Sequence, residues 1–176
     1  MARIESVEYS LSHATVCSTG VAWSASGGTN SLSGVPMVFW QDGTPWREAN
    51  VWLCQQAFSD TYDIKTVQSK ASALLTYTRW LEKNNVSWCS FPERKDERCL
   101  NRFRGALVLM RNEGQLAPST TSSKLRVVIQ FYKWMMAEKI IQPSRPLWIT
   151  TDSTVHFSST TGSPKTRQIG STGQHG

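Results

Sequence analysis

Two stretches of the sequence decide the fold: KTVQSKASALLTYTRWL, from Lys65 to Leu81, and STTSSKLRVVIQFYKWM, from Ser119 to Met135. They share one pattern at an offset of fifty-four residues: Thr66 matches Thr120, Ser69 matches Ser123, Lys70 matches Lys124, Trp80 matches Trp134, Tyr77 pairs with Phe131, and Arg79 pairs with Lys133. Apolar residues recur in both stretches at helical spacing, so each is predicted to form an amphipathic helix.

The first of these helices is predicted from about Ile64 to Asn84, with Asp63 as its N-cap. A second is predicted from Asp96 to Asn112, and Gly114 suits its C-terminal end. The third begins at Pro118, which suits a first helical position, and runs to about Lys139. These segments predict an all-α fold, a small helical bundle of about four helices with short connections.

The segment before the bundle is less regular. Arg47 to Phe58 is compatible with a short helix, and Val35 to Trp46 with a strand or short β-hairpin turning at Asp42-Gly43. From Ser10 to Gly34, 14 of 25 residues are Ser, Thr or Gly, and from Thr150 to Gly176, 16 of 27 are, so both ends are predicted to be disordered tails. The predicted organisation is a flexible segment (1–34), a strand, turn and helix leader (35–60), a helical domain (61–143) and a linker (144–176).

The positive charge is concentrated in the predicted bundle. Residues 61–140 hold 14 Lys and Arg against 7 Asp and Glu, whereas the remainder holds 5 against 6. A basic compact domain with nearly neutral ends favours a polyanionic partner, for which nucleic acid is the usual candidate.

Other classes are disfavoured. The acidic residues Glu5 and Glu8 interrupt the apolar run that a signal peptide needs, and no stretch is long and apolar enough to cross a bilayer, so we expect a cytoplasmic protein without a membrane partner. The four cysteines form no C-x-x-C pair and the three histidines lie far from them in sequence, so we expect no metal site and no cofactor.

The beginnings of the two matching helices combine hydroxyl groups, a lysine and unpaired backbone N–H groups, which together suit phosphate. The alternative interpretation is that Ser and Thr are ordinary residues at helix starts and that the lysines only solvate an edge. The candidate DNA-binding residues are Lys65, Thr66, Gln68, Ser69, Lys70, Arg79, Ser119, Thr120, Ser122, Ser123, Lys124 and Lys133.

The stretch LAPSTTSSKLRVVIQFYKWMMAEKII, Leu116 to Ile141, closely resembles the last part of the core-binding domain of tyrosine recombinases, the phage-integrase family. The residues that fit the family's pattern are Leu116, Pro118, Ser119, Thr120, Leu125, Val128, Phe131, Tyr132, Trp134 and Met135. The stretch KTVQSKASALLTYTRWLEKNNVSW is similar to the family's opening helix, although Lys70 stands where an aromatic residue or His is frequent.

This resemblance implies a helical domain that grips one face of duplex DNA, beside further recombinase protomers in a synaptic complex. It also implies a separate catalytic domain with a nucleophilic Tyr and an H-x-x-R motif. That motif is not found here, and Thr150 to Gly176 is interpreted as the beginning of an interdomain linker. We therefore expect DNA binding without catalysis, in a parent protein that integrates and recombines DNA.

Two other classes remain open. The first is an α-helical protein–protein interaction module with no nucleic-acid partner, which evenly scattered basic residues would favour. The second is an RNA-binding domain or an unrelated metal-free enzyme. No constellation of paired carboxylates, no nucleophile with its base and no Gly-rich phosphate loop supports an enzyme.

Overall fold

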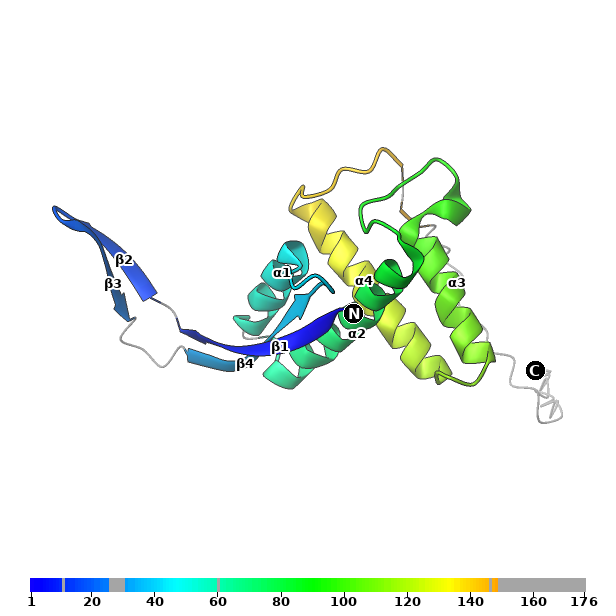
Figure 1. Ribbon diagram of the computed structural model, residues 1–176, viewed down its shortest axis with the longest axis horizontal. Coiled ribbons are helices and arrows are strands. Elements are labelled where there is room, and N and C mark those ends of the chain that lie inside the picture. Colours follow the sequence, from blue (N-terminus) through cyan, green and yellow to red (C-terminus); the bar gives the residue numbers. More distant parts are fainter. Residues whose placement is uncertain (11, 26–30, 60, 146, 149–176) are drawn as a thin grey trace, which may run out of the picture.

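The computed structural model describes residues 1–10, 12–25, 31–59, 61–145 and 147–148. Along the chain its elements are β1 (Arg3–Ser10), β2 (Ser12–Cys17), β3 (Gly20–Ala25), β4 (Ser31–Phe39), α1 (Arg47–Ala57), α2 (Ile64–Asn84), the 3₁₀-helix η1 (Lys95–Glu97), α3 (Cys99–Asn112) and α4 (Pro118–Ala137). Figure 1 shows the four α-helices grouped at one side with β1 and β4 beside α1 and α2, and the hairpin of β2 and β3 extending away from them.

The prediction of an all-α fold was wrong, because the described chain contains two antiparallel sheets of two strands each. Strand β1 pairs with β4, from Arg3 opposite Phe39 to Ser10 opposite Ser31, and β2 pairs with β3. Most of the segment 10–34, predicted as a disordered tail, therefore lies in strands. The predicted linker falls largely outside the described residues, apart from 144–145 and 147–148.

The observed bounds of the helices agree closely with those predicted from the sequence. Helix α2 has the predicted bounds, and the carboxylate of Asp63 caps it by accepting a hydrogen bond from the Thr66 N–H at 2.7 Å. Helix α3 begins later than predicted, at Cys99, because the preceding residues form η1. Helix α4 begins at Pro118 as predicted. None of the described helices is both long and apolar enough to cross a membrane.

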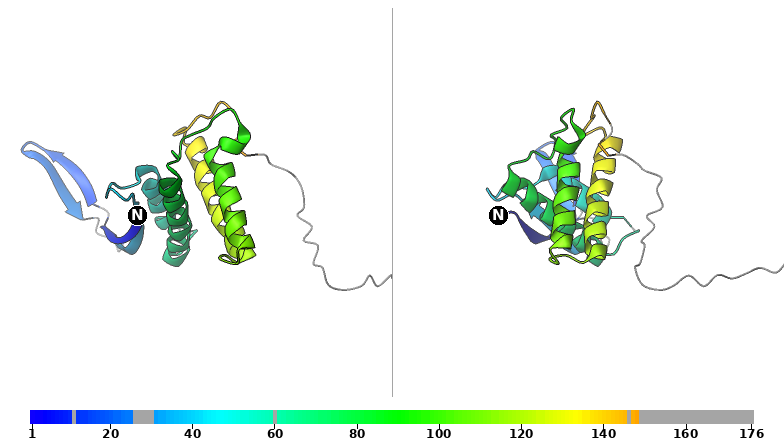
Figure 2. Two further views of the ribbon diagram at one scale, coloured as in Figure 1. Left: turned by 45° about the vertical axis from the view of Figure 1, so that its right-hand side comes forward. Right: turned by 90° about the vertical axis from the view of Figure 1, so that its right-hand side faces the viewer.

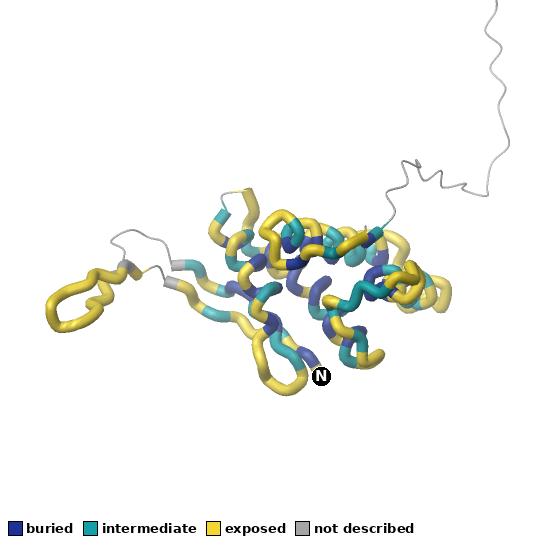
Figure 3. The backbone as a smooth tube through the Cα atoms, turned by 90° about the horizontal axis from the view of Figure 1, so that it is seen from above, coloured by how far each residue is buried: buried dark blue, intermediate teal, exposed yellow. Residues whose placement is uncertain are grey.

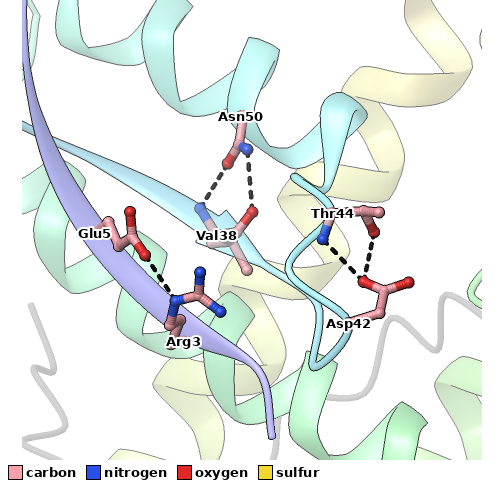
Figure 4. A network of polar contacts seen from close by, with 6 residues as sticks. All are labelled: Arg3, Glu5, Val38, Asp42, Thr44 and Asn50. Atoms are coloured by element: carbon pink, nitrogen blue, oxygen red, sulfur yellow. Dashed lines mark hydrogen bonds and ion pairs between the residues drawn. The ribbon is translucent and has the colours of Figure 1, made fainter.

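Strand β4 is attached to the helices by the buried side chain of Asn50 in α1. Its Oδ1 accepts from the Val38 N–H at 2.7 Å, and its Nδ2 donates to the Val38 carbonyl at 3.0 Å (Figure 4). The amide thus satisfies both backbone groups of Val38, as a neighbouring strand would. The Trp46 N–H donates to the same carbonyl at 2.9 Å.

Strands and helices share one hydrophobic core. Val35 and Val38 of β4 lie in the same buried cluster as residues from all four α-helices. Near its centre the Trp46 ring meets Phe131 edge-on at 5.3 Å between centroids. The sheet formed by β1 and β4 is therefore part of the packed unit rather than an appendage.

The repeat in the sequence is accompanied by a repeat in the positions that the two helices bury in the core. Positions fifty-four residues apart are buried in both helices: Val67 and Thr121, Leu74 and Val128, Tyr77 and Phe131, Leu81 and Met135. Side chains three or four residues apart share a helix face, so α2 and α4 bury the same stripe of their common pattern. The two helices cross in Figure 1, and Figure 2 shows α3 and α4 side by side and antiparallel.

Candidate nucleic-acid interface

The charged side chains of helices α2, α3 and α4 are almost all positive. They contain four, three and three Lys or Arg residues respectively, against the single carboxylate of Glu82. That carboxylate accepts backbone N–H donors from Ala2 at 2.9 Å and from Gln41 at 2.7 Å. These two hydrogen bonds fix the carboxylate in the fold, and Glu82 remains the one negative charge among the Lys and Arg residues of the three helices.

The solvent face of α2 is a continuous polar stripe. Its residues succeed one another at spacings of four and three, which keeps them on one side of a helix. We call this set the α2 stripe: Lys65, Ser69, Ser72, Thr76, Arg79 and Lys83. All are exposed except Thr76, which is partly buried, and none is acidic.

The C-terminal half of the α2 stripe borders a groove between α2 and α3. The groove has a volume of about 480 Å³. It is lined by Thr76, Arg79 and Lys83 of the stripe together with Trp80 and Glu82 of α2, Met110 of α3, Met1 and Gln41. We call it the α2–α3 groove.

Two more cations approach the α2–α3 groove from neighbouring helices. The Arg102 guanidinium of α3 lies 5.9 Å from the centroid of the Trp80 ring, which also lines the groove. The Lys124 ammonium of α4 donates to the Thr76 hydroxyl at 2.8 Å, and partial burial lowers the pKa of this lysine. Three helices thus place cations around one groove.

A second groove is lined by carboxylates and, among the described residues, by no cationic side chain. Its volume is about 570 Å³, and it lies beside the turn after β4 and the end of α2. Its described lining residues include Asp42 and no Lys or Arg, whereas Glu82 lines both grooves. A polyanion would be repelled there, so the α2–α3 groove is the better candidate for nucleic acid.

Lys70 is turned away from the α2 stripe. Only 8% of it is exposed, and its Nζ donates to Gln56 Oε1 at 2.5 Å. The same ammonium lies 3.4 Å from the centroid of the Tyr62 ring and 5.5 Å from that of Trp52. Burial lowers its pKa. These contacts hold α2 against α1, so we leave Lys70 out of the candidate interface.

The other predicted residues near the beginning of α2 have mixed roles. Lys65 and Ser69 are exposed on the α2 stripe. The Thr66 N–H is held by the helix cap, and Gln68 Nε2 donates to the Gly34 carbonyl of β4 at 3.1 Å. Further along the helix, the Arg79 Nε donates to the Ala2 carbonyl at 3.0 Å.

In α4 the predicted hydroxyl residues Ser119, Ser122 and Ser123 are exposed, and Thr120 is partly buried. Lys133 is exposed, with its Nζ 6.0 Å from the centroid of the Trp148 ring. The beginnings of α2 and α4 do not border one groove: α2 begins beside β4 and α1, whereas Lys124 near the beginning of α4 meets the middle of α2. Figures 1 and 2 show these two beginnings apart.

Sequence reasoning missed Lys83 as a candidate, although its spacing of four from Arg79 was a usable signal. Judged by its position in the sequence alone, Arg98 would lie on the outer face of the predicted helix from Asp96 to Asn112, together with Arg102, Arg104 and Arg111. In the structure Arg98 is buried, and it donates to the carbonyls of Pro92 and Glu93 at 3.1 and 3.0 Å. Its charge therefore serves the loop before α3 rather than the surface.

No set of three or more His, Cys, Asp or Glu side chains in the described part of the chain is placed to hold a metal ion. A scan against protein-family models gave no match, and searches of curated proteins and of solved structures found no significant similarity.

Proposed function

We propose that this protein binds double-stranded DNA through the α2 stripe and the α2–α3 groove. In this proposal it acts in the cytoplasm as the core-binding domain of a tyrosine recombinase of the phage-integrase type. It would thereby contribute to DNA integration and recombination together with further recombinase protomers.

The observation that carries the proposal is the charge of the three helices. The three helices contain ten Lys or Arg residues, nine of them besides the inward-turned Lys70, against the single carboxylate of Glu82. Ordinary surfaces intersperse both signs, whereas surfaces that bind a phosphate backbone are rich in Lys and Arg alone. The enrichment therefore favours a polyanion over a protein partner.

The shape of the α2 stripe also suits duplex DNA. Lys65 and Lys83 lie eighteen residues apart on one helix, which corresponds to about 27 Å at 1.5 Å per residue. A B-DNA major groove is about 12 Å wide, so the stripe is long enough to reach phosphates on both sides of it. The hydroxyls of Ser69 and Ser72 between the cations can donate to phosphate or to base edges, whereas the Thr76 hydroxyl already donates to the Ser72 carbonyl at 3.1 Å.

We further propose that the chain binds DNA without cutting it. Phosphodiester cleavage by a tyrosine needs an exposed phenol and cations positioned for the charge of the transition state. Tyr77 and Tyr132 are fully buried and hydrogen-bonded to each other at 2.8 Å. Neither phenol can reach a phosphate in this fold, and the two exposed tyrosines, Tyr9 and Tyr62, are not accompanied by an H-x-x-R motif in the sequence.

The test is a titration of a fluorescently labelled duplex with the protein at low and moderate salt. We expect saturable binding that weakens steeply as salt increases, because each neutralised phosphate releases condensed counterion. Incubation with supercoiled plasmid should produce neither relaxed DNA nor a covalent adduct. Absence of binding at low salt would refute the DNA proposal, and a covalent adduct would refute the non-catalytic part.

A further inference from the structure

The hairpin formed by β2 and β3 lies apart from the helices (Figure 1). Its antiparallel register runs from Ser12 opposite Ala25 to Cys17 opposite Gly20. Within the described residues, β2 and β3 pair only with each other. Both outer edges of this hairpin therefore present backbone donors and acceptors that a further strand could use.

One face of the hairpin is apolar and open to solvent. Ala14 lies opposite Trp23 and Val16 opposite Val21, and because side chains alternate along a strand all four share a face. Val16 is 83% exposed, Trp23 72% and Val21 55%. Figure 3 shows the described parts of this hairpin as exposed.

The hairpin also lacks the usual protection against strand addition. From Tyr9 to Gln41 the sequence contains no Asp, Glu, Lys or Arg. The strands themselves contain no Pro. Natural edge strands commonly carry charges, Pro or bulges that discourage pairing with another chain. An isolated two-stranded hairpin is only marginally stable in water, so an added strand would stabilise it.

We propose that the β2–β3 hairpin pairs edge to edge with the same hairpin of a second copy of this chain, forming a four-stranded antiparallel sheet. The absence of charged residues from the hairpin favours a second hairpin of the same sequence as its partner. A hairpin without cations has nothing to neutralise phosphates, so nucleic acid does not fit it. An identical uncharged strand meets no electrostatic repulsion, and antiparallel pairing about a two-fold axis is self-complementary.

The pairing also unites the apolar faces. Adjacent strands in a sheet bring side chains of the same face into cross-strand contact, so the valines and Trp23 of one copy would meet those of the other. Because the hairpin lies apart from the helices, two paired copies would keep both α2 stripes accessible. This inference does not depend on DNA binding.

Charge-swap variants test the proposal by analytical ultracentrifugation over a range of concentrations. Val16→Lys and Val16→Glu probe the β2 edge, and Val21→Lys and Val21→Glu probe the β3 edge. We expect wild type to dimerise and, at the edge that pairs, each single variant to dimerise about tenfold less tightly because like charges meet across the two-fold axis. Mixing the Lys and Glu variants of that edge should restore association, which only contact between two copies can produce.

The matched control is Val51→Lys, which makes the same change at an exposed valine of α1. It should leave dimerisation unaltered, and circular dichroism should show unchanged helix content in every variant. A wild-type protein that stays monomeric up to its solubility limit would overturn the proposal. So would failure of both mixtures to restore association, or hairpin variants that lose DNA affinity while self-association is unchanged.

Discussion

The ammonium of Lys124 donates to the hydroxyl of Thr76 at 2.8 Å, which joins the second turn of α4 to the middle of α2. The corresponding lysine of the sequence repeat, Lys70, instead donates to Gln56 and lies under Tyr62. Two residues in matching positions therefore have different partners. Several matching apolar positions of the repeat are buried in the core of both helices. The matching lysines do not form a shared phosphate site.

Asn50 should be a strong contributor to stability. Replacing it with Ala leaves the buried Val38 N–H without its acceptor, which costs about 1–3 kcal/mol, whereas the Val38 carbonyl keeps the Trp46 N–H as a donor. We expect the free energy of unfolding, measured by urea denaturation, to fall by about 1–3 kcal/mol. The control is Asn84→Ala, which removes an exposed side chain bonded only to the Trp80 carbonyl and should cost much less. Equal losses would contradict this account of how β4 is attached.

Trp80 and Trp134 occupy matching positions of the repeat but differ in burial. Trp80 is 8% exposed, whereas Trp134 is only partly buried and donates through its Nε1 to Gln55 at 2.8 Å. We expect Trp80→Ala to cost about 3–5 kcal/mol, as for other large aromatic deletions in cores, and Trp134→Ala to cost clearly less. Thermal and urea unfolding of the two variants measure this difference. A larger loss for Trp134 would show that the repeat's second copy is the more important core element.

The buried tyrosine pair predicts how stability depends on alkaline pH. Burial raises the pKa of both Tyr77 and Tyr132 well above the usual 10.0. In the unfolded chain both phenols lose their protons near pH 10, while the folded protein retains them. The stabilising contribution is therefore complete below that pH and is lost as pH rises above it, by up to about 1.4 kcal/mol per pH unit for each tyrosine.

Urea unfolding at several pH values between about 8 and 11 tests this, with the Tyr77→Phe/Tyr132→Phe variant as comparison. The variant should lose stability with rising pH less steeply than wild type. Lys70 and Lys124, whose pKa values are lowered by burial, contribute with the opposite sign. Because both proteins contain these lysines, their effect cancels in the comparison. Identical pH profiles would contradict the protonated, buried pair.

The helices could be predicted from the sequence because their signals are local. The Asp63 cap, Pro118 and the apolar spacing each act within a few residues of the boundary they set. The pairing of β1 with β4 could not be predicted in the same way, because Ile4 meets Val38 across more than thirty residues. A high content of Ser, Thr and Gly indicates a segment that packs poorly by itself. This composition gives no information about whether the segment pairs with a distant strand.

The candidate site was predictable only in part. Arg79 and Lys124 were identified from the repeated pattern; Arg79 lines the α2–α3 groove, and Lys124 donates to Thr76, which lines it. The inward orientation of Lys70 depends on Gln56 and Tyr62, which come from α1 and the loop after it. Such contacts follow from tertiary packing. The periodicity of α2 alone therefore cannot distinguish Lys70 from the lysines on the surface.

The most direct test of the central proposal is the slope of log DNA affinity against log salt concentration for four proteins. They are wild type, Arg79→Ala/Lys83→Ala, the control Arg94→Ala/Arg145→Ala, and Lys70→Met. Both double variants remove two exposed charges, but Arg94 and Arg145 are ion-paired away from the α2 stripe, with Asp96, Glu97 and Glu93.

Each phosphate contact contributes about −0.9 to this slope, so loss of Arg79 and Lys83 should flatten it by about 1.8. The slopes of the control and of Lys70→Met should equal that of wild type. An unchanged slope for Arg79→Ala/Lys83→Ala, or an equal flattening in the Arg94→Ala/Arg145→Ala control, would contradict DNA binding through the α2 stripe.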